Sequence, residues 1–429
     1  MDEGARSITD RATKDAQERS TNLRIAITWL VTRALALASI ALTPRLLDDI
    51  DIYRGWLPYL RWAQYPLADE KWQYPPGAGP VLLAPSWLPI NYSVAFAVLC
   101  VLLDAAILGM LLMTHARAPG SPRSGLWLWA MAGVVVGPIM FTRFDIVPAF
   151  FAVGFVILAG RPVLAGASAA LGFVVKVWPA FLLIALPRAH WRRGTVAFVA
   201  TTALVLLVIA SRFDGIWSFL ANQRARGLQV ESTGALPYEL FALARGPMRS
   251  GLEYGAYQVL MPGAELVGTA VFVAGLITMG VIAWWRFSGR LDAVPVGDVA
   301  LTLVLVSVVT SRVYSPQYNV WIVAVAAAAL LSPRSMMRRV SMLVATASVL
   351  TQVIYPWFPY DLMDGNPPVV AVQGLRIVAL VAATVVALHS ILTTPATTAA
   401  ILDRRLEPLG DAHSEEVWTS CQASPSRSE

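Results

Sequence analysis

The side chains of this sequence that could do chemistry are concentrated in a few short polar stretches between long apolar runs. The first stretch, DDIDIY, begins at residue 48 and holds Asp49, Asp51 and Tyr53. Carboxylates of this kind can accept a proton from a hydroxyl group. Later stretches carry cations that can bind phosphate, arginine through a bidentate fork and lysine as a point charge. Together these groups suit a substrate with a phosphate and a hydroxyl to be deprotonated.

Other polar residues stand at the ends of the apolar runs. Charges at a membrane boundary are costly to desolvate, so they are usually held in a polar cavity or paired with each other. Each also has an ordinary structural explanation, because an acid can cap a helix and opposite charges can pair within a loop. The candidate substrate-binding residues are Tyr53, Tyr74, Arg143, Asp145, Lys176, Arg224, Arg226, Glu231, Arg312, Tyr314, Gln317 and Tyr318.

The elements that must position these residues are long and apolar. The chain has 429 residues, of which 57% are hydrophobic and 14% charged, and its mean hydropathy is +0.60. This is too apolar for a soluble protein of that length, and apolar runs of about 20 residues recur along it. The runs are continuous rather than alternating, which argues against a transmembrane β-barrel. The sequence therefore predicts an all-α, polytopic helical membrane protein with about twelve spans.

Several predicted spans are short. The two beside Lys176 are shorter than a perpendicular span requires, and such segments are tolerated only where they line a cavity inside protein. The windows are 25–43, 92–113, 125–141, 145–160, 162–175, 177–187, 195–211, 266–285, 297–310, 318–332, 340–354 and 369–392.

The distribution of lysine and arginine predicts the orientation of these spans. If residues 1–24 form a cytoplasmic tail, the inside loops carry more basic residues than the outside loops, as membrane proteins prefer. The spans and loops of residues 25–393 then form one membrane domain, with long external loops at about 44–91 and 212–265. Residues 394–429 form a second cytoplasmic tail with the composition of a disordered segment. All of the polar stretches fall on the outer face.

The polar stretches also resemble a known family. The segments DIDIY, YPPGA, RFD, KVWP, RGLQVES and SPQYNVW occur in this order between residues 49 and 321, and the resemblance that they carry spans about residues 25–392. In order and spacing they resemble glycosyltransferase family 87, the polyprenyl-phosphate-mannose-dependent α-mannosyltransferases of the GT-C superfamily, and its actinobacterial members most. The resemblance implies a bundle with a large external cavity and a long first external loop that supplies the catalytic aspartate.

In that family the catalytic aspartate precedes a tyrosine by four residues, which assigns the role to Asp49. The resemblance implies direct displacement with inversion, in which Asp49 takes the proton of the acceptor hydroxyl while the lipid phosphate leaves. Asp51 would complete a DxD-like pair. Aromatic residues of the first loop, among them Trp56, Trp72 and Tyr74, would stack on sugar faces.

The implied partners are a polyprenyl-phosphate-sugar donor, a lipid-linked or cell-envelope glycan acceptor, and the lipid bilayer of the cytoplasmic membrane. No cofactor is expected, because the sugar arrives on a lipid and the sequence has neither a GxGxxG turn nor a Walker lysine motif. No obligatory metal is expected, although the DxD-like pair leaves open the binding of a divalent ion. Nucleic-acid binding is not expected, because the sequence contains no basic segment interleaved with aromatic residues.

Three alternatives remain at this stage. The same architecture can use a polyprenyl-phosphate pentose and act as an arabinofuranosyltransferase. A flippase or transporter of lipid-linked sugars would show repeats and charges at mid-depth, and no convincing repeat is visible. A non-catalytic scaffold would tolerate loss of the loop acids. Inside or near the spans, Arg33, Asp104, Arg376 and His389 are expected to form buried structural pairs.

Overall fold

Long apolar helices dominate the computed structural model, which describes residues 2–118, 120–224 and 226–393. Within the described residues, 6 helical segments are long and apolar enough to cross a membrane. These lie in α1 (Asp2–Ile40), α4 (Tyr92–Arg117), α9 (Arg188–Ala210), α12 (Ala264–Phe287), α15 (Arg338–Gln352) with the π-helical turn η5 (Val353–Trp357), and α17 (Pro367–Thr393). The chain is a multi-pass membrane protein.

Shorter apolar helices fill the bundle between the long ones. They are α5 (Ser124–Val135), α7 (Ile146–Ile157), α8 (Pro162–Val175), α13 (Val296–Val309) and α14 (Tyr318–Ala329), together with the turn α6 (Ile139–Thr142) and the 3-10 segment η3 (Trp178–Ala185). Nearly every residue of α13 and α14 is buried, so these two helices form the core. Short helices are acceptable here because protein rather than lipid surrounds them.

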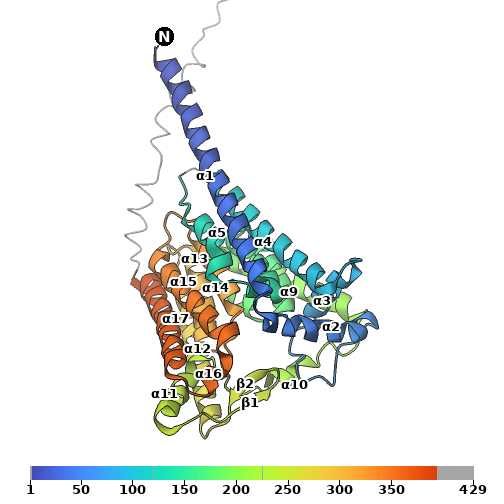
Figure 1. The fold of residues 1–429 in the computed structure, drawn as a ribbon. Helices are drawn as coiled ribbons and strands as arrows, with labels where there is room; N and C mark the ends of the chain where they lie inside the picture. The colour runs from blue at the N-terminus through green and yellow to red at the C-terminus, as the bar shows by residue number, and fades with distance from the viewer. Residues whose placement is uncertain (1, 119, 225, 394–429) are drawn as a thin grey trace, which may run out of the picture.

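The segments between the membrane helices gather at one end of the molecule, away from the N-terminal end of α1 (Figure 1). The first set is η1 (Pro44–Leu47), α2 (Asp48–Arg61), α3 (Ala78–Leu83) and η2 (Ala84–Trp87). The second set is α10 (Phe219–Arg224), η4 (Thr233–Ala235), α11 (Leu236–Arg245), the antiparallel pair β1 (Ser250–Glu253) and β2 (Ala256–Val259), and, further along the chain, α16 (Pro359–Met363). The all-α prediction is confirmed, with this small hairpin as an addition.

Hydrogen bonds join these two sets of segments. The side chain of Asn222 donates to the carbonyl oxygens of Asp69 and Trp72 at 3.2 and 3.0 Å. Gln223 donates to the carbonyl of Gln73 at 2.6 Å, and Gln73 donates to the carbonyl of Tyr254 in the hairpin at 2.6 Å. Segments about 150 residues apart in sequence therefore form one layer across the end of the bundle.

Buried ion pairs fix the helices beneath this layer. Arg33 of α1 forms a bidentate pair with Asp104 of α4, with both distances 2.8 Å. Arg376 of α17 pairs with Glu231 at 3.0 Å. The prediction of structural pairing is confirmed for these residues. It is wrong for His389, which lies on the exposed side of α17 because that face of the helix points away from the bundle.

Candidate active site

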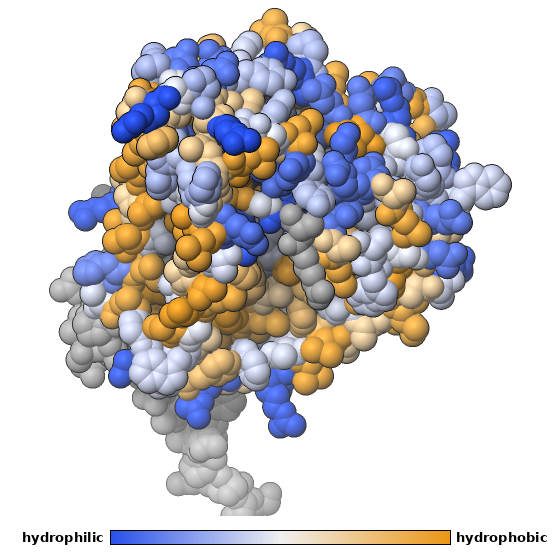
Figure 2. Space-filling view, turned by 90° about the horizontal axis from the view of Figure 1, so that it is seen from below, coloured by the Kyte–Doolittle hydropathy of each residue, from blue (hydrophilic) through white to orange (hydrophobic). Residues whose placement is uncertain are grey.

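A cavity of about 650 Å³ opens at the end of the molecule where the segments between the membrane helices gather. Figure 2, which views this end, shows a hollow bordered by hydrophilic residues on one side and by hydrophobic residues on the other. Its walls come from α2, from the segment after it, from the break between α8 and η3, and from the start of α14. The size is in the range of sites for small molecules.

Most of the candidate residues meet in this cavity. Those lining it are Asp49, Tyr53, Tyr74, Arg143, Lys176, Arg226, Glu231, Gln317 and Tyr318. Asp51, Asp145, Arg312 and Tyr314 are not among the lining residues. The side chain of Arg224 lies outside the described part of the structure. Residues distant in sequence are thus brought to one site.

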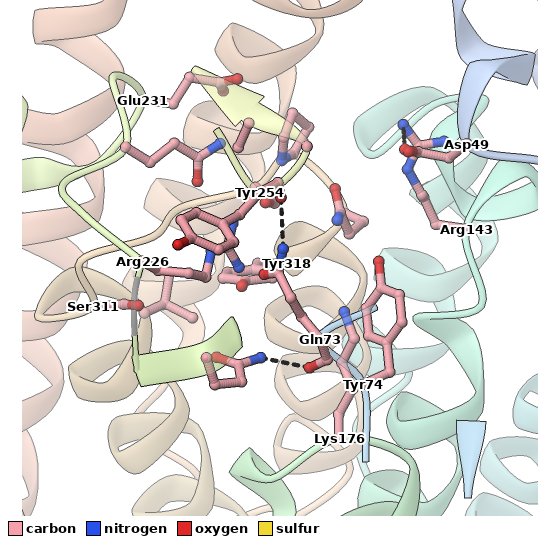
Figure 3. Close-up of a pocket in the computed structure, with 18 of the residues that line it drawn as sticks. Asp49, Gln73, Tyr74, Arg143, Lys176, Arg226, Glu231, Tyr254, Ser311 and Tyr318 are labelled. Carbon is pink, nitrogen blue, oxygen red and sulfur yellow. Dashed lines mark hydrogen bonds and ion pairs between the residues drawn. The ribbon is translucent and has the colours of Figure 1, made fainter. Parts of the chain in front are cut away.

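Asp49 sits in the first turn of α2, where the positive end of the helix dipole favours a carboxylate. Its Oδ2 pairs with Nη2 of Arg143 at the cavity wall (Figure 3). The Asp49 side chain is 30% exposed, whereas that of Arg143 is only 6% exposed. The acid is therefore accessible to a substrate, and the cation that holds it is fixed inside the protein.

Three further contacts hold the guanidinium of Arg143. Arg143 ends the turn α6 in an extended conformation, and Nη1 donates to the carbonyls of Leu46 and Thr142 at 3.3 and 3.2 Å. Nη2 also donates to the hydroxyl of Tyr355 at 2.9 Å. A guanidinium held at several atoms keeps one orientation, so it also fixes the orientation of Asp49.

Asp51, two residues along the same helix, points elsewhere. Its side chain is 55% exposed and pairs with Arg54, one turn away on α2, at 2.8 Å. Residues two apart on a helix do not share a face. The structure thus separates the two acids of the DxD-like pair.

Lys176 lies in the break between α8 and η3, and its side chain reaches the cavity wall. Its Nζ donates to Oδ1 of Asp145 at 2.6 Å, and the Asp145 side chain is 1% exposed. The rings of Tyr74, Phe144, Tyr318 and Trp321 surround the ammonium group at 5.0 to 5.6 Å. Arg143 thus pairs with the carboxylate of Asp49, whereas Asp145 pairs with the ammonium group of Lys176.

Arg226 differs from Arg143 and Lys176 in its lack of a counter-charge. Among the described residues it forms no ion pair, and its Nε is buried without a hydrogen-bond partner. Arg45, immediately before the DDIDIY stretch, also lines the cavity, with its guanidinium 4.9 Å from the ring centre of Tyr360. Arg45 was not among the predicted binding residues, although its position three residues before Asp48 was an available signal.

Three further candidates, Glu231, Arg312 and Tyr314, have structural partners. Glu231 is held by Arg376, and burial raises its pKa, an effect that Arg376 partly opposes. Arg312 donates to Thr269 at 2.7 Å, and the buried hydroxyl of Tyr314 donates to Asn319 at 3.0 Å. Glu231 nevertheless also faces the cavity.

The aromatic residues of the site divide into two kinds. Trp72 is 1% exposed and packs against Trp56 and Tyr65 behind the cavity wall, whereas Trp56 and Tyr74 line the cavity. Burial raises the pKa of the Tyr74 hydroxyl above the ordinary value of a tyrosine. Trp178, Trp321, Tyr355 and Tyr360 also line the cavity. Trp178 and Trp321 belong to the segments KVWP and SPQYNVW, but they were not among the predicted binding residues.

The described residues include no group of three or more His, Cys, Asp or Glu side chains arranged to hold a metal ion. The expectation that no metal is required remains a prediction.

The sequence model of glycosyltransferase family 87 matches residues 72–316. The matched range contains Tyr74, Arg143, Lys176 and Arg226 of the cavity, and it begins after Asp49. No curated protein and no solved structure matched the chain.

Proposed function

Because the chain belongs to glycosyltransferase family 87, we propose that it is an inverting GT-C mannosyltransferase with a polyprenyl-phosphate-mannose donor. The acceptor is a lipid-linked or cell-envelope glycan, and the reaction takes place at the outer face of the cytoplasmic membrane. The family supports sugar transfer. The choice of mannose and of a polyprenyl carrier rests on the resemblance of the polar stretches.

The observation that carries the proposal is the accessible carboxylate of Asp49, held by Arg143 in the wall of the large cavity. Arg143 occupies Oδ2 and leaves Oδ1 available to a hydroxyl group. In the proposed step the acceptor oxygen attacks the anomeric carbon and the bond from that carbon to the phosphate oxygen breaks. Asp49 takes the acceptor's proton, as a carboxylate base does for water in inverting glycosidases.

The leaving phosphate needs positive charge rather than a proton. Arg226 supplies it best, since no described carboxylate is paired with it. Arg45 is a second cation in the same cavity, close in sequence to the end of α1. In the view of Figure 3, Arg226 lies across the cavity from Asp49, as displacement with inversion requires of the base and the leaving group.

Transfer by the purified protein in nanodiscs tests the proposal. Radiolabelled polyprenyl-phosphate-mannose is incubated with the protein and with lipid glycans extracted from the host cell, and labelled products are separated. We expect label in a glycolipid with wild-type protein and label that appears about 10² times more slowly, or slower still, with Asp49→Asn. Label from a polyprenyl-phosphate pentose but not from the mannose donor would replace mannose by arabinofuranose. Donor moved across the bilayer without any product would favour a flippase.

A further inference from the structure

The two residues of the ion pair between Lys176 and Asp145 differ in their access to the cavity. Lys176 lines the cavity, while Asp145 does not and is almost completely buried behind it. The contact of 2.6 Å uses one of the three N–H donors of the ammonium group, and no other hydrogen bond of this group is formed with the described residues. The remaining donors are available to a ligand.

The charge of Lys176 is compensated before any ligand binds. A phosphate would have to compete with Asp145, which is fixed at contact distance in a poorly solvated place. Arg226 and Arg45 carry no such counter-charge among the described residues. A neutral hydrogen-bond acceptor does not need the uncompensated positive charge of Lys176 and does not repel Asp145. The ion pair therefore suits a hydroxyl group better than an anion.

Flat aromatic surfaces stand beside the ammonium group. Tyr318 stacks on Trp321 with 4.0 Å between ring centroids, and Trp321 stacks on Trp178 at 5.0 Å. These three rings line the cavity together with Tyr74. Sites of this composition, with aromatic walls and a few fixed polar groups, bind small ligands that have one apolar and one polar aspect. A sugar ring has both, with C–H groups on its faces and hydroxyl groups at its edge.

The location of Lys176 and Tyr74 in the cavity agrees with a role in binding the transferred sugar. In Figure 3, Lys176 and Tyr74 lie between Asp49 on one side and Arg226 on the other. Inversion places the sugar between the base and the leaving phosphate. The aromatic wall and Lys176 therefore border the space that the ring of the donor sugar would take.

We propose that Lys176, held by Asp145 and flanked by Tyr74, Tyr318 and Trp321, binds a hydroxyl group of the transferred sugar and not the phosphate of its carrier. This assignment rests on the proposed function, since it presumes a sugar carried on a lipid phosphate. Asp145 acts through Lys176 and is a positioning residue.

Binding of two lipids separates the sugar from the phosphate. The purified full chain in nanodiscs is titrated with polyprenyl phosphate and with polyprenyl-phosphate-mannose, without acceptor. We expect Lys176→Met to weaken binding of the mannosyl lipid about tenfold or more, because a hydrogen bond from a charged donor is lost, and to change binding of the bare phosphate lipid less than about twofold.

Lys71→Met is the matched control. Lys71 lines the same cavity but is exposed and makes no ion pair with the described residues. This variant measures what the loss of one positive charge from the cavity does to both lipids. We expect any effect of Lys71→Met to be equal for the two lipids, unlike that of Lys176→Met.

A second variant guards against misfolding, since Lys176→Met leaves the buried Asp145 unpaired. The double variant Asp145→Asn with Lys176→Met removes both charges and avoids that penalty. It should show the same selective loss of the mannosyl lipid.

Three results would overturn the assignment. Equal loss of both lipids in the Lys176 variants would place the phosphate at Lys176 while leaving the donor class intact. Unchanged binding of both lipids, with a raised KM for the acceptor, would place the acceptor's sugar there instead. If wild-type protein bound neither lipid, the proposed donor itself would be wrong.

Discussion

At the scale of single residues, the central feature is a carboxylate whose orientation is set by a buried cation. Asp49→Asn keeps the size and polarity of the side chain but removes its capacity to take a proton. Turnover should therefore fall by about 10² or more while donor binding persists. Initial rates at saturating donor, combined with lipid titration, measure both quantities.

Asp51→Asn is the control for this change. It makes the same substitution two residues away, at an exposed side chain that pairs with Arg54 outside the cavity. We expect turnover close to that of wild type. Near-normal turnover of the Asp49 variant would exclude it as the base, and loss of activity in the folded Asp51 variant alone would transfer the role to Asp51.

Arg143 offers a second test at this scale. Arg143→Gln should lower kcat by about tenfold to a hundredfold, because Asp49 would no longer be held in the orientation needed to take the proton. The donor KM should stay nearly unchanged. A cation beside a carboxylate favours its ionised form, so the acid limb of the pH–rate profile should move to higher pH in the variant. Tyr355→Phe removes only one hydrogen bond to the guanidinium and should act in the same direction more weakly. A large rise in donor KM with an unshifted profile would instead make Arg143 a phosphate ligand.

At the scale of secondary-structure elements, hydropathy predicted most of the fold. Each predicted window coincides with an apolar helix or, at 177–187, with the 3-10 segment η3. The break at Lys176 was also predicted, because a lysine followed by Trp178-Pro179 interrupts an apolar run. Periodicity and length are local properties, so the sequence alone contains them.

The arrangement of the external segments could not be predicted in the same way. The hairpin β1–β2 is a local turn that hydropathy does not reveal, whereas the bonds from Gln73 and Gln223 depend on contacts between segments far apart in the chain. The same reason prevented a prediction that Trp178 and Trp321, which belong to two separate segments, stack on each other beside Lys176. Likewise, the pairing of Glu231 with Arg376 joins residues 145 positions apart.

The packing of α11 against α17 leads to a prediction about pH. Glu239 of α11 is 1% exposed, and its Oε1 accepts a hydrogen bond from Gln373 at 3.1 Å. Burial raises the pKa of Glu239 to about 8, although Arg376 and Gln373 act to lower it and Glu231 adds to the rise. The acid is thus protonated in the folded protein at neutral pH, whereas in the unfolded chain it ionises near its ordinary value of 4.5.

A carboxyl group with a raised pKa stabilises the fold most below its unfolded pKa, and this stability is lost as the pH rises to about 8. Glu239→Gln mimics the protonated form at every pH. The variant should therefore gain melting temperature over wild type as the pH rises from 5 to 9, with the two proteins closest at pH 5, measured in detergent by tryptophan fluorescence. Parallel melting curves across that range would show that Glu239 is ionised in the folded protein.

At the scale of the whole molecule, the two ends of the bundle differ in charge and in shape. The end opposite the cavity carries basic residues at the termini of α4, α9, α12 and α15, namely Arg117, Arg188, Arg192, Arg193, Arg290, Arg338 and Arg339. Membrane proteins keep such residues in the cytoplasm. The other end holds the layer of external segments and the opening of the cavity (Figure 1).

This asymmetry predicts that the cavity faces away from the cytoplasm, which single cysteines can test in intact cells. Ala68 is exposed in the first external segment and Ser288 is exposed just after α12 at the opposite end. In a background with Cys421→Ser, Ala68→Cys should react with an impermeant maleimide, whereas Ser288→Cys should react only after the membrane is permeabilised. Cys100 is buried and should stay silent. The reverse labelling pattern would place Asp49 and Arg226 on the cytoplasmic side, where a donor presented in the outer leaflet could not reach them.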